Sequence, residues 1–172
     1  FGRGDEFLSM IASLIKVFPI IPVAGNGQSI FQPLSADDIS RCIGLALEQP
    51  RFRNQLIEIG GDQFFTYNQM IDLAAGTLGK KPIKLHIPMP LIRFIVRLME
   101  LSTHHLPVTS NQLDLLRVPN YTTQHSLEEW FGFAPRRLQT HMDYLGQITL
   151  LECLKAIIGI SAVAEHTKRP LE

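Results

Sequence analysis

The histidines and cysteines of the chain are the residue types that could bind a metal ion. The six histidines are His86, His104, His105, His125, His141 and His166. They form no His-Glu-x-x-His motif and no pair spaced as zinc ligands with the two cysteines. We therefore expect surface or capping histidines and no metal site. Cys42 and Cys153 lie far apart in apolar helical patterns, which favours a reduced protein over a disulfide framework.

Motifs for nucleophilic catalysis and for dinucleotide binding are also missing from this sequence. There is no Gly-x-Ser-x-Gly elbow and no Gly-x-Gly-x-x-Gly pattern after a strand. Residues 76–81, GTLGKK, follow a predicted helix, where the helix dipole repels anions. None of the three tyrosines, Tyr67, Tyr121 and Tyr144, is followed four residues later by a lysine that would lower its pKa. The sequence therefore predicts no catalytic residue and no cofactor-binding residue.

Three predicted helices in the first part of the chain would position any site. Apolar residues recur every three or four positions over residues 5–18, 35–49 and 66–79. Each of these stretches begins with a residue typical of an N-cap: Asp5, Ser35 and Thr66. Asp38 and Gln69, three residues after Ser35 and Thr66, would complete two capping boxes.

Four stretches have the composition of strands. They are residues 20–24, 29–35, 55–61 and 82–89, and the clearest is 55–61, QLIEIGG, which ends at a glycine pair. Residues 82–89 alternate strictly, with Ile83, Leu85, Ile87 and Met89 on one side and Lys84 and His86 on the other. This period of two predicts a half-buried strand with Lys84 and His86 on its wet face.

The second part of the chain is predicted to be mostly helical. We expect helices from Pro90, from Ser110 and from Ser126, the last capped with Glu129, and a further segment near residues 138–145. Residues 147–168 form an apolar C-terminal segment. Before its last turns, the charged residues of this segment are Glu152 and Lys155. A bilayer span needs about 20 apolar residues, so a buried or subunit-packing helix is favoured over a membrane span. The predicted fold class is α+β, mostly helical with a few short strands.

Composition excludes some kinds of partner. The 172 residues include 16 basic and 16 acidic side chains, so the basic stripe typical of nucleic-acid-binding proteins is not expected. No secretory signal pattern precedes the first residue, which favours a cytoplasmic protein, and membrane association is not favoured. Residues 169–172 resemble a tail left by cloning, and both ends look cut, so we expect a piece of a longer protein.

Four stretches of the sequence, in this order and spacing, carry a family resemblance. They are residues 1–8 (FGRGDEFL), 25–47 (GNGQSIFQPLSADDISRCIGLAL), 55–80 (QLIEIGGDQFFTYNQMIDLAAGTLGK) and 87–98 (IPMPLIRFIVRL). Together they resemble the carboxyl-terminal half of an extended or atypical short-chain dehydrogenase/reductase over residues 1–146. The resemblance is greatest to the branch that holds the dehydrogenase-like accessory subunit of respiratory complex I and bacterial proteins described as sugar-nucleotide epimerases.

The resemblance implies a substrate-binding lobe over residues 1–146 that lacks the dinucleotide-binding half of the Rossmann fold. In the family, NAD(P) is bound by glycines and a Tyr/Lys pair of the amino-terminal half. We therefore expect NAD(P) in the full-length oxidoreductase or epimerase-like protein, and an inactive chain without cofactor here. The implied substrate contacts lie in the 3–7 turn and the 28–34 stretch: Arg3, Asp5, Phe7, Gln28, Phe31, Gln32 and Leu34. The alternative for Arg3 and Gln32 is hydrogen bonding to loop backbone, and for Phe31 it is a place in the core.

One departure from the family pattern concerns the substrate. Sugar-nucleotide enzymes carry an arginine that faces the substrate diphosphate, and alignment on Gly25-Asn26-Gly27 puts Phe31 at that position. An aromatic ring cannot form the charge-assisted hydrogen bonds that a phosphate accepts. This favours an apolar or quinone-like ligand, or no turnover.

Two other functions stay open from the sequence. The chain could belong to a non-catalytic scaffold or assembly protein related to the complex I subunit, or it could be a free-standing α+β interaction domain. If the Rossmann half is missing, bare apolar faces favour self-association, so we expect a homo-oligomer, most simply a dimer.

Overall fold

The computed structural model describes residues 1–102, 121–122 and 125–157. The helices in this part are α1 (Glu6–Val17), α2 (Ala36–Glu48), α3 (Tyr67–Thr77), α4 (Met89–Ser102), α6 (Ser126–Phe131) and α7 (Leu150–Ile157). The strands are β1 (Ile20–Ala24), β2 (Ile30–Phe31), β3 (Phe65–Thr66) and β4 (Ile83–Ile87). The predicted α+β class is therefore confirmed. The helix predicted from Ser110 and residues 158–172 lie outside the described residues.

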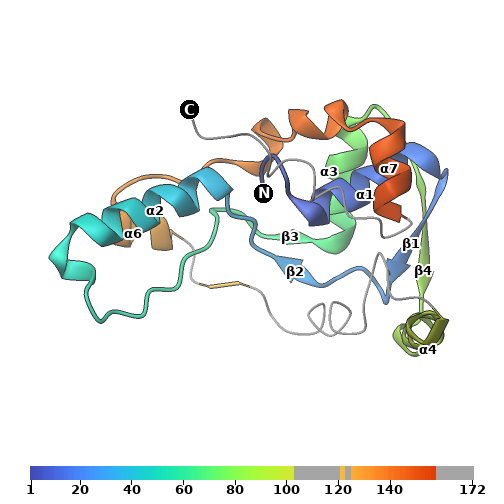
Figure 1. Cartoon of the computed structure of the whole chain (residues 1–172), viewed down its shortest axis with the longest axis horizontal. Coiled ribbons are helices and arrows are strands. Elements are labelled where there is room, and N and C mark those ends of the chain that lie inside the picture. Colours follow the sequence, from blue (N-terminus) through green and yellow to red (C-terminus); the bar gives the residue numbers. More distant parts are fainter. Residues whose placement is uncertain (103–120, 123–124, 158–172) are drawn as a thin grey trace.

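The strands form two small sheets. β1 and β4 pair in parallel, with Ile20 opposite Ile83, and β2 pairs antiparallel with β3, with Phe31 opposite Phe65. Helices α1, α3 and α7 gather at the end of the molecule that holds β1 and β4, while α2 and α6 lie together at the other end (Figure 1). The β2–β3 pair lies between these two groups of helices (Figure 1).

The core is built around α1. Its side chains at Leu8, Ile11 and Ile15 are buried with Ile21 and Val23 of β1. The core is completed by residues of α3 and of the C-terminal region: Met70, Ile71, Ala74, Ala75, Leu138, Met142 and Leu145. Leu138 belongs to the short 3-10 helix η2 (Leu138–Thr140), and Leu145 belongs to a second one, η3 (Asp143–Gln147). Cys42 and Cys153 are buried and free, as expected of reduced thiols.

The predicted caps are mostly confirmed. The Asp5 carboxylate accepts hydrogen bonds from the backbone N–H groups of Phe7 and Leu8, and Thr66 and Gln69 form a complete capping box. Ser35 caps α2 by accepting from the N–H of Asp37, but the predicted box with Asp38 does not form. Asp38 instead accepts a hydrogen bond from the backbone N–H of Arg136 at 2.8 Å, because the C-terminal region packs against this end of α2.

Helix α6 begins at the predicted residue but with a different cap. Its N-cap is His125, in the left-handed region at φ 65°, and Ser126 is the first helical residue. The buried Ser126 hydroxyl accepts a hydrogen bond from the backbone N–H of Gly60 at 3.1 Å. The prediction of Ser126 as the cap was wrong, because the Ser126 hydroxyl accepts its hydrogen bond from Gly60 and not from the first turn of α6.

The strand predicted over residues 55–61 is absent. The segment has no strand assignment, and the Leu56 side chain is 93% exposed. A strand forms only where a neighbouring strand satisfies its backbone groups, and among the described residues neither sheet has a strand beside this segment. The prediction was therefore wrong for this chain, although the residues are strand formers.

The burial of β4 agrees only in part with the predicted alternation. His86 is exposed and Ile87 is half-buried as predicted, but Ile83 and Leu85 are 66% and 55% exposed, and Lys84 is half-buried and pairs with Asp72 of α3. The reason is that Lys84 and His86 lie opposite Ile21 and Val23 of β1, which face the core formed by α1 and α3.

Candidate functional site

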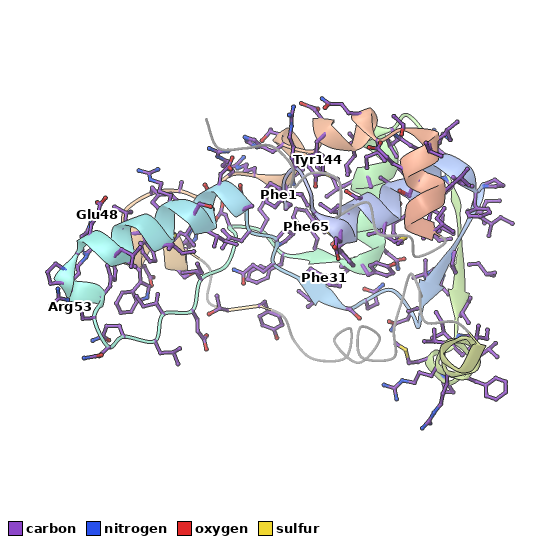
Figure 2. The ribbon with its side chains drawn as sticks, viewed as in Figure 1. Phe1, Phe31, Glu48, Arg53, Phe65 and Tyr144 are labelled. Carbon is purple, nitrogen blue, oxygen red and sulfur yellow. The ribbon has the colours of Figure 1, made fainter. Side chains whose placement is uncertain are left out.

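Three aromatic rings meet where α1, β2 and α3 come together, and we call them the aromatic cluster: Phe7, Phe31 and Tyr67. The ring centroids of Phe7 and Phe31 lie 5.2 Å apart, and that of Tyr67 lies 6.0 and 6.2 Å from them. Phe31 projects from β2 in the middle of the molecule (Figure 2). Burial raises the pKa of the Tyr67 phenol, so Tyr67 acts as a neutral ring here. The surface of this cluster suits apolar contact rather than anion binding.

Gln32, next to Phe31, connects two segments that are distant in sequence. Its Nε2 donates to the carbonyl of Gly61 at 2.7 Å, and its Oε1 accepts from the backbone N–H of Thr122 at 2.7 Å. A Cβ at Gly60 would lie 2.4 Å from the amide of Gln32, so a side chain at Gly60 would displace this amide from its two partners. Both polar atoms of the Gln32 amide are therefore hydrogen-bonded to the backbone of loops. Beside it lies a shallow hollow of about 320 Å³, lined also by Glu58 and Tyr121.

Asp5 has two structural partners. One carboxylate oxygen caps α1, and the other accepts a hydrogen bond from the Tyr144 hydroxyl at 3.2 Å. Burial, followed by the negative charge of Asp5, raises the pKa of Tyr144 far above its ordinary value of 10. Asp5 therefore ties the start of α1 to η3.

Arg3 lies in a second hollow of about 410 Å³ on the other side of this turn. The hollow carries charges of both signs, because Asp37, Arg136 and Asp143 also line it. Arg136 forms an ion pair with Asp37. Tyr144 forms part of the same wall, near Phe1 (Figure 2). This hollow offers no excess of either charge.

The two stretches predicted to contact substrate, residues 3–7 and residues 28–34, touch each other at some positions only. Phe7 meets Phe31 in the aromatic cluster, and Leu34, half-buried, accepts a hydrogen bond through its carbonyl from the Phe1 nitrogen at 2.6 Å. Gln28 is exposed on the turn after β1, where its N–H donates to Asn26 Oδ1. Arg3 and Gln28 are thus separate from the aromatic cluster, and Gln32 and Asp5 are occupied by the fold.

Sequence reasoning missed a polar chain at the carboxyl ends of β1 and β4. It runs from Asn26 through Asn68 on α3 to His86 on β4. The one available signal was the place of His86 in the alternating strand, but that pattern indicated solvent rather than α3. Among the described residues, no group of three or more His, Cys, Asp or Glu side chains could hold a metal ion.

Comparison with known sequences gives relatives of one kind. No family model matches the chain. Subunit 9 of the NADH dehydrogenase [ubiquinone] 1 alpha subcomplex, a mitochondrial protein, is 28% identical to the chain over 96 residues in Dictyostelium discoideum. The Arabidopsis thaliana subunit 9 is 22% identical over 107 residues. These matches cover 55% and 62% of this chain but 27% of each relative, so the chain spans about a quarter of their length.

Comparison with solved structures gives the fold. The UDP-glucose 4-epimerase of Thermotoga maritima, solved with UDP-glucose, matches with a TM-score of 0.57 and 16% sequence identity. The match covers 86% of this chain and 42% of the epimerase. The fold of this chain is therefore similar to part of the fold of this epimerase. The predicted resemblance to the dehydrogenase-like accessory subunit of complex I is confirmed by the two curated relatives, and the predicted likeness to epimerases by the fold.

Within the part of the chain that the structure describes, no helix has the length and apolar character to cross a membrane.

Proposed function

We propose that this chain is the ligand-side lobe of a longer NAD(P)-binding protein of the oxidoreductase or epimerase type, over residues 1–146. The Rossmann half, which would bind the cofactor, is then a separate part of the same protein. The partial coverage of both the curated relatives and the solved epimerase supports this proposal. On its own, the chain would bind NAD(P)H very weakly and turn over nothing.

The observation that carries the proposal is an uncharged, open face on α2, which we call the α2 stripe. Its positions share one side of the helix: Ala36, Ile39, Ser40, Ile43, Ala46 and Leu47. Residues three, four and seven apart lie on the same side of a helix. The side chains of Ile39, Ile43 and Leu47 are 38%, 56% and 83% exposed. A contiguous apolar face of this kind typically marks a contact with another part of a protein.

The Rossmann sheet is the partner that fits this face. The α2 stripe is followed by residues 55–61, whose strand-forming sequence has no strand neighbour among the described residues. We propose that residues 55–61 join the parallel sheet of the Rossmann half as a strand, and that the α2 stripe packs on the same sheet. Parallel sheets carry helices on their faces, so both features need the same partner.

The aromatic cluster supports an apolar ligand. Phe31 stands where the sugar-nucleotide enzymes have an arginine, and its ring contacts are Phe7 and Tyr67. A diphosphate would meet ring faces there instead of N–H donors, which removes the hydrogen bonds that would offset its desolvation. We infer that the lobe accepts a neutral, largely apolar compound.

Calorimetric titration of NADPH and NADH tests the proposed role. The chain of 172 residues should show no binding, and the longer protein should bind one of the two. Ile43→Arg in the longer protein should weaken that binding at least tenfold, because a charge in the α2 stripe separates the halves. Leu150→Arg, at a similarly exposed leucine on α7, is the matched control and should bind as the parent does. Micromolar binding to the 172 residues alone would overturn the proposal.

A non-catalytic role is the second candidate. Both curated relatives are named as subunits of a NADH dehydrogenase, and the alignment that we propose puts Phe31 where sugar-nucleotide enzymes have a substrate-binding arginine. In this role the longer protein would hold a nucleotide for stability and serve assembly. The upstream sequence discriminates between the two candidates: a Tyr-x-x-x-Lys motif with intact glycines supports an enzyme, and glycines without that motif support a scaffold.

A further inference from the structure

Helix α4 lies at the edge of the molecule with an apolar face open to solvent. It stands beyond the end of β4, apart from the other labelled helices and at the opposite end from α2 (Figure 1). The side chains of Leu91, Phe94 and Ile95 are 51%, 64% and 42% exposed. Residues three and four positions apart lie on the same side of a helix, so these three side chains share one face.

The buried position of α4 shows which way this face is directed. Val96 is buried, so its side of the helix is the side turned toward the protein. Phe94 comes two residues earlier, which places it about 160° away around a helix of 3.6 residues per turn. The most exposed apolar side chain of the helix therefore points away from the rest of the molecule.

The charges that accompany α4 are all positive. Residues 80–97 contain no Asp or Glu and five cationic side chains: Lys80, Lys81, Lys84, Arg93 and Arg97. Because the whole chain has 16 basic and 16 acidic residues, its neutral total conceals this segregation. Arg97 is exposed and lies three residues after Phe94, so it flanks the apolar face.

The outer face of β4 continues the apolar surface toward the helix. Ile83 and Leu85 are 66% and 55% exposed, and Pro88 connects the strand to α4. Lys81, just before the strand, is exposed, and Lys84 pairs with Asp72 of α3. One stretch of chain thus combines five exposed large apolar side chains with an unbroken positive charge pattern.

An anionic lipid bilayer matches both properties of α4. Helices that lie in a membrane interface bury an apolar face at the boundary of headgroups and acyl chains and carry Lys and Arg beside it. The long stem of an arginine lies along apolar surface while its guanidinium stays at the level of the phosphates. A protein partner would have to supply an apolar groove and acidic side chains around it, whereas a bilayer with anionic headgroups combines the two.

We infer that α4 docks along the surface of an anionic bilayer, with Leu91, Phe94 and Ile95 below the headgroups and Arg97 against their phosphates. This contact leaves the proposed function untouched, because the α2 stripe lies at the other end of the molecule (Figure 1). It also differs from the membrane span considered for residues 147–168, since α4 lies along the bilayer and does not cross it.

Flotation of the 172 residues with lipid vesicles tests the inference. Vesicles of equal parts phosphatidylglycerol and phosphatidylcholine should bind about tenfold more tightly than vesicles of phosphatidylcholine alone. Leu91→Glu should weaken this binding about tenfold or more, because it removes apolar contact and adds a repelled charge. Leu150→Glu is the matched control, at a leucine in the first turn of α7 that is 66% exposed, and should bind as the parent does.

A pair of arginine variants separates a local contact from an effect of net charge. Arg97→Gln should weaken binding to the anionic vesicles about fivefold, the effect of one cationic side chain at the membrane surface. Arg53→Gln changes the net charge by the same amount at an exposed arginine of the opposite end (Figure 2) and should leave binding unchanged. Circular dichroism of each variant confirms that the fold is kept.

Tryptophan fluorescence reports insertion directly. The sequence has one tryptophan, Trp130 of α6, at the end of the molecule away from α4 (Figure 1). Anionic vesicles should leave the emission of the parent unchanged and should shift that of Phe94→Trp to shorter wavelengths, because its indole enters the apolar layer.

Four results would overturn the inference. They are equal affinity for neutral and anionic vesicles, no binding to either, an equal loss of binding in Leu91→Glu and Leu150→Glu, and no spectral shift in Phe94→Trp. If the chain ignores vesicles while Leu91→Glu shifts its sedimentation toward monomer, the face of α4 is a contact between copies and the inference is wrong.

Discussion

Phe31 lies at the position where we propose that sugar-nucleotide enzymes carry a substrate-facing arginine, and under that proposal its ring determines which ligands the candidate site can recognise. It also contributes to stability, since it packs with Phe7 and Tyr67 at centroid distances of 5.2 and 6.2 Å. Aromatic pairs at such distances contribute beyond the area that they bury. A substitution here therefore changes both folding and recognition.

Replacing Phe31 by leucine should lower the free energy of unfolding by about 1–2 kcal/mol, through loss of two ring contacts. Urea unfolding followed by circular dichroism measures this change. Phe94→Leu, at an exposed phenylalanine of α4, is the matched control and should cost less than about 0.5 kcal/mol. Equal costs at the two positions would contradict the packing role of the aromatic cluster.

Tyr144 predicts a loss of stability at alkaline pH. Its pKa is raised by burial and by Asp5, so the folded state favours the protonated phenol. The resulting stability is complete below pH 10, the ordinary value, and falls as the pH rises above 10. Tyr144→Phe should lose about 1 kcal/mol at pH 8 with its hydrogen bond to Asp5, and should then lose less than the parent above pH 10.

Urea unfolding at pH 8 and pH 11 measures both effects of Tyr144→Phe. Tyr121→Phe changes an exposed tyrosine and serves as the control. Parallel pH dependences for the parent and Tyr144→Phe would show that Tyr144 has no such role.

At the scale of single residues, the sequence predicted local structure better than function. Asp5, Thr66 and Gln69 cap helices as expected, because capping depends on residues two or three positions apart. The same locality could not reveal that Asp5 also receives the Tyr144 hydroxyl, or that Gln32 is held by Gly61 and Thr122. Those partners are 29 to 139 positions away in the sequence.

At the scale of elements, periodicity identified the helices and the buried faces of α1 and α3, but not those of α2 and β4. β4 was predicted correctly as a strand, yet Ile83 and Leu85 are exposed because the core helices α1 and α3 pack on the other face of the sheet, which carries Ile21 and Val23 of β1. α2 was likewise predicted, but Ile43 and Leu47 lie on its open side. A strand or helix face is buried only where a second layer covers it, and a single sequence does not contain that information.

Two glycines allow the packing around residues 55–61 to be tested with one type of substitution. A Cβ at Gly61 would lie 1.9 Å from the carbonyl oxygen of Pro33, so Gly61→Ala should push the segment away and cost about 1–3 kcal/mol. At Gly44 in α2, an added Cβ would have no described atom within 4 Å, so Gly44→Ala should gain about 0.5–1 kcal/mol. Thermal unfolding measures both changes, and a loss at Gly44 or a gain at Gly61 would contradict this packing.

At the scale of the whole molecule, the open apolar surfaces predict association. The α2 stripe, Leu56 and the outer face of β4 are exposed together in a chain with no formal net charge. Apolar surface without charge repulsion favours contacts between copies. Sedimentation velocity of the 172 residues should show a dimer or larger species that shifts toward monomer in Ile43→Arg. A monodisperse monomer at high concentration would contradict this expectation.

The central claim is that residues 55–61 become a strand when the sheet of a Rossmann half lies beside them. Amide hydrogen exchange of this segment, measured by mass spectrometry in the 172 residues and in the longer protein, tests it most directly. We expect fast exchange of residues 56–59 in the 172 residues, where no strand lies beside them among the described residues, and exchange at least a hundredfold slower in the longer protein. Equally fast exchange in both proteins would contradict it.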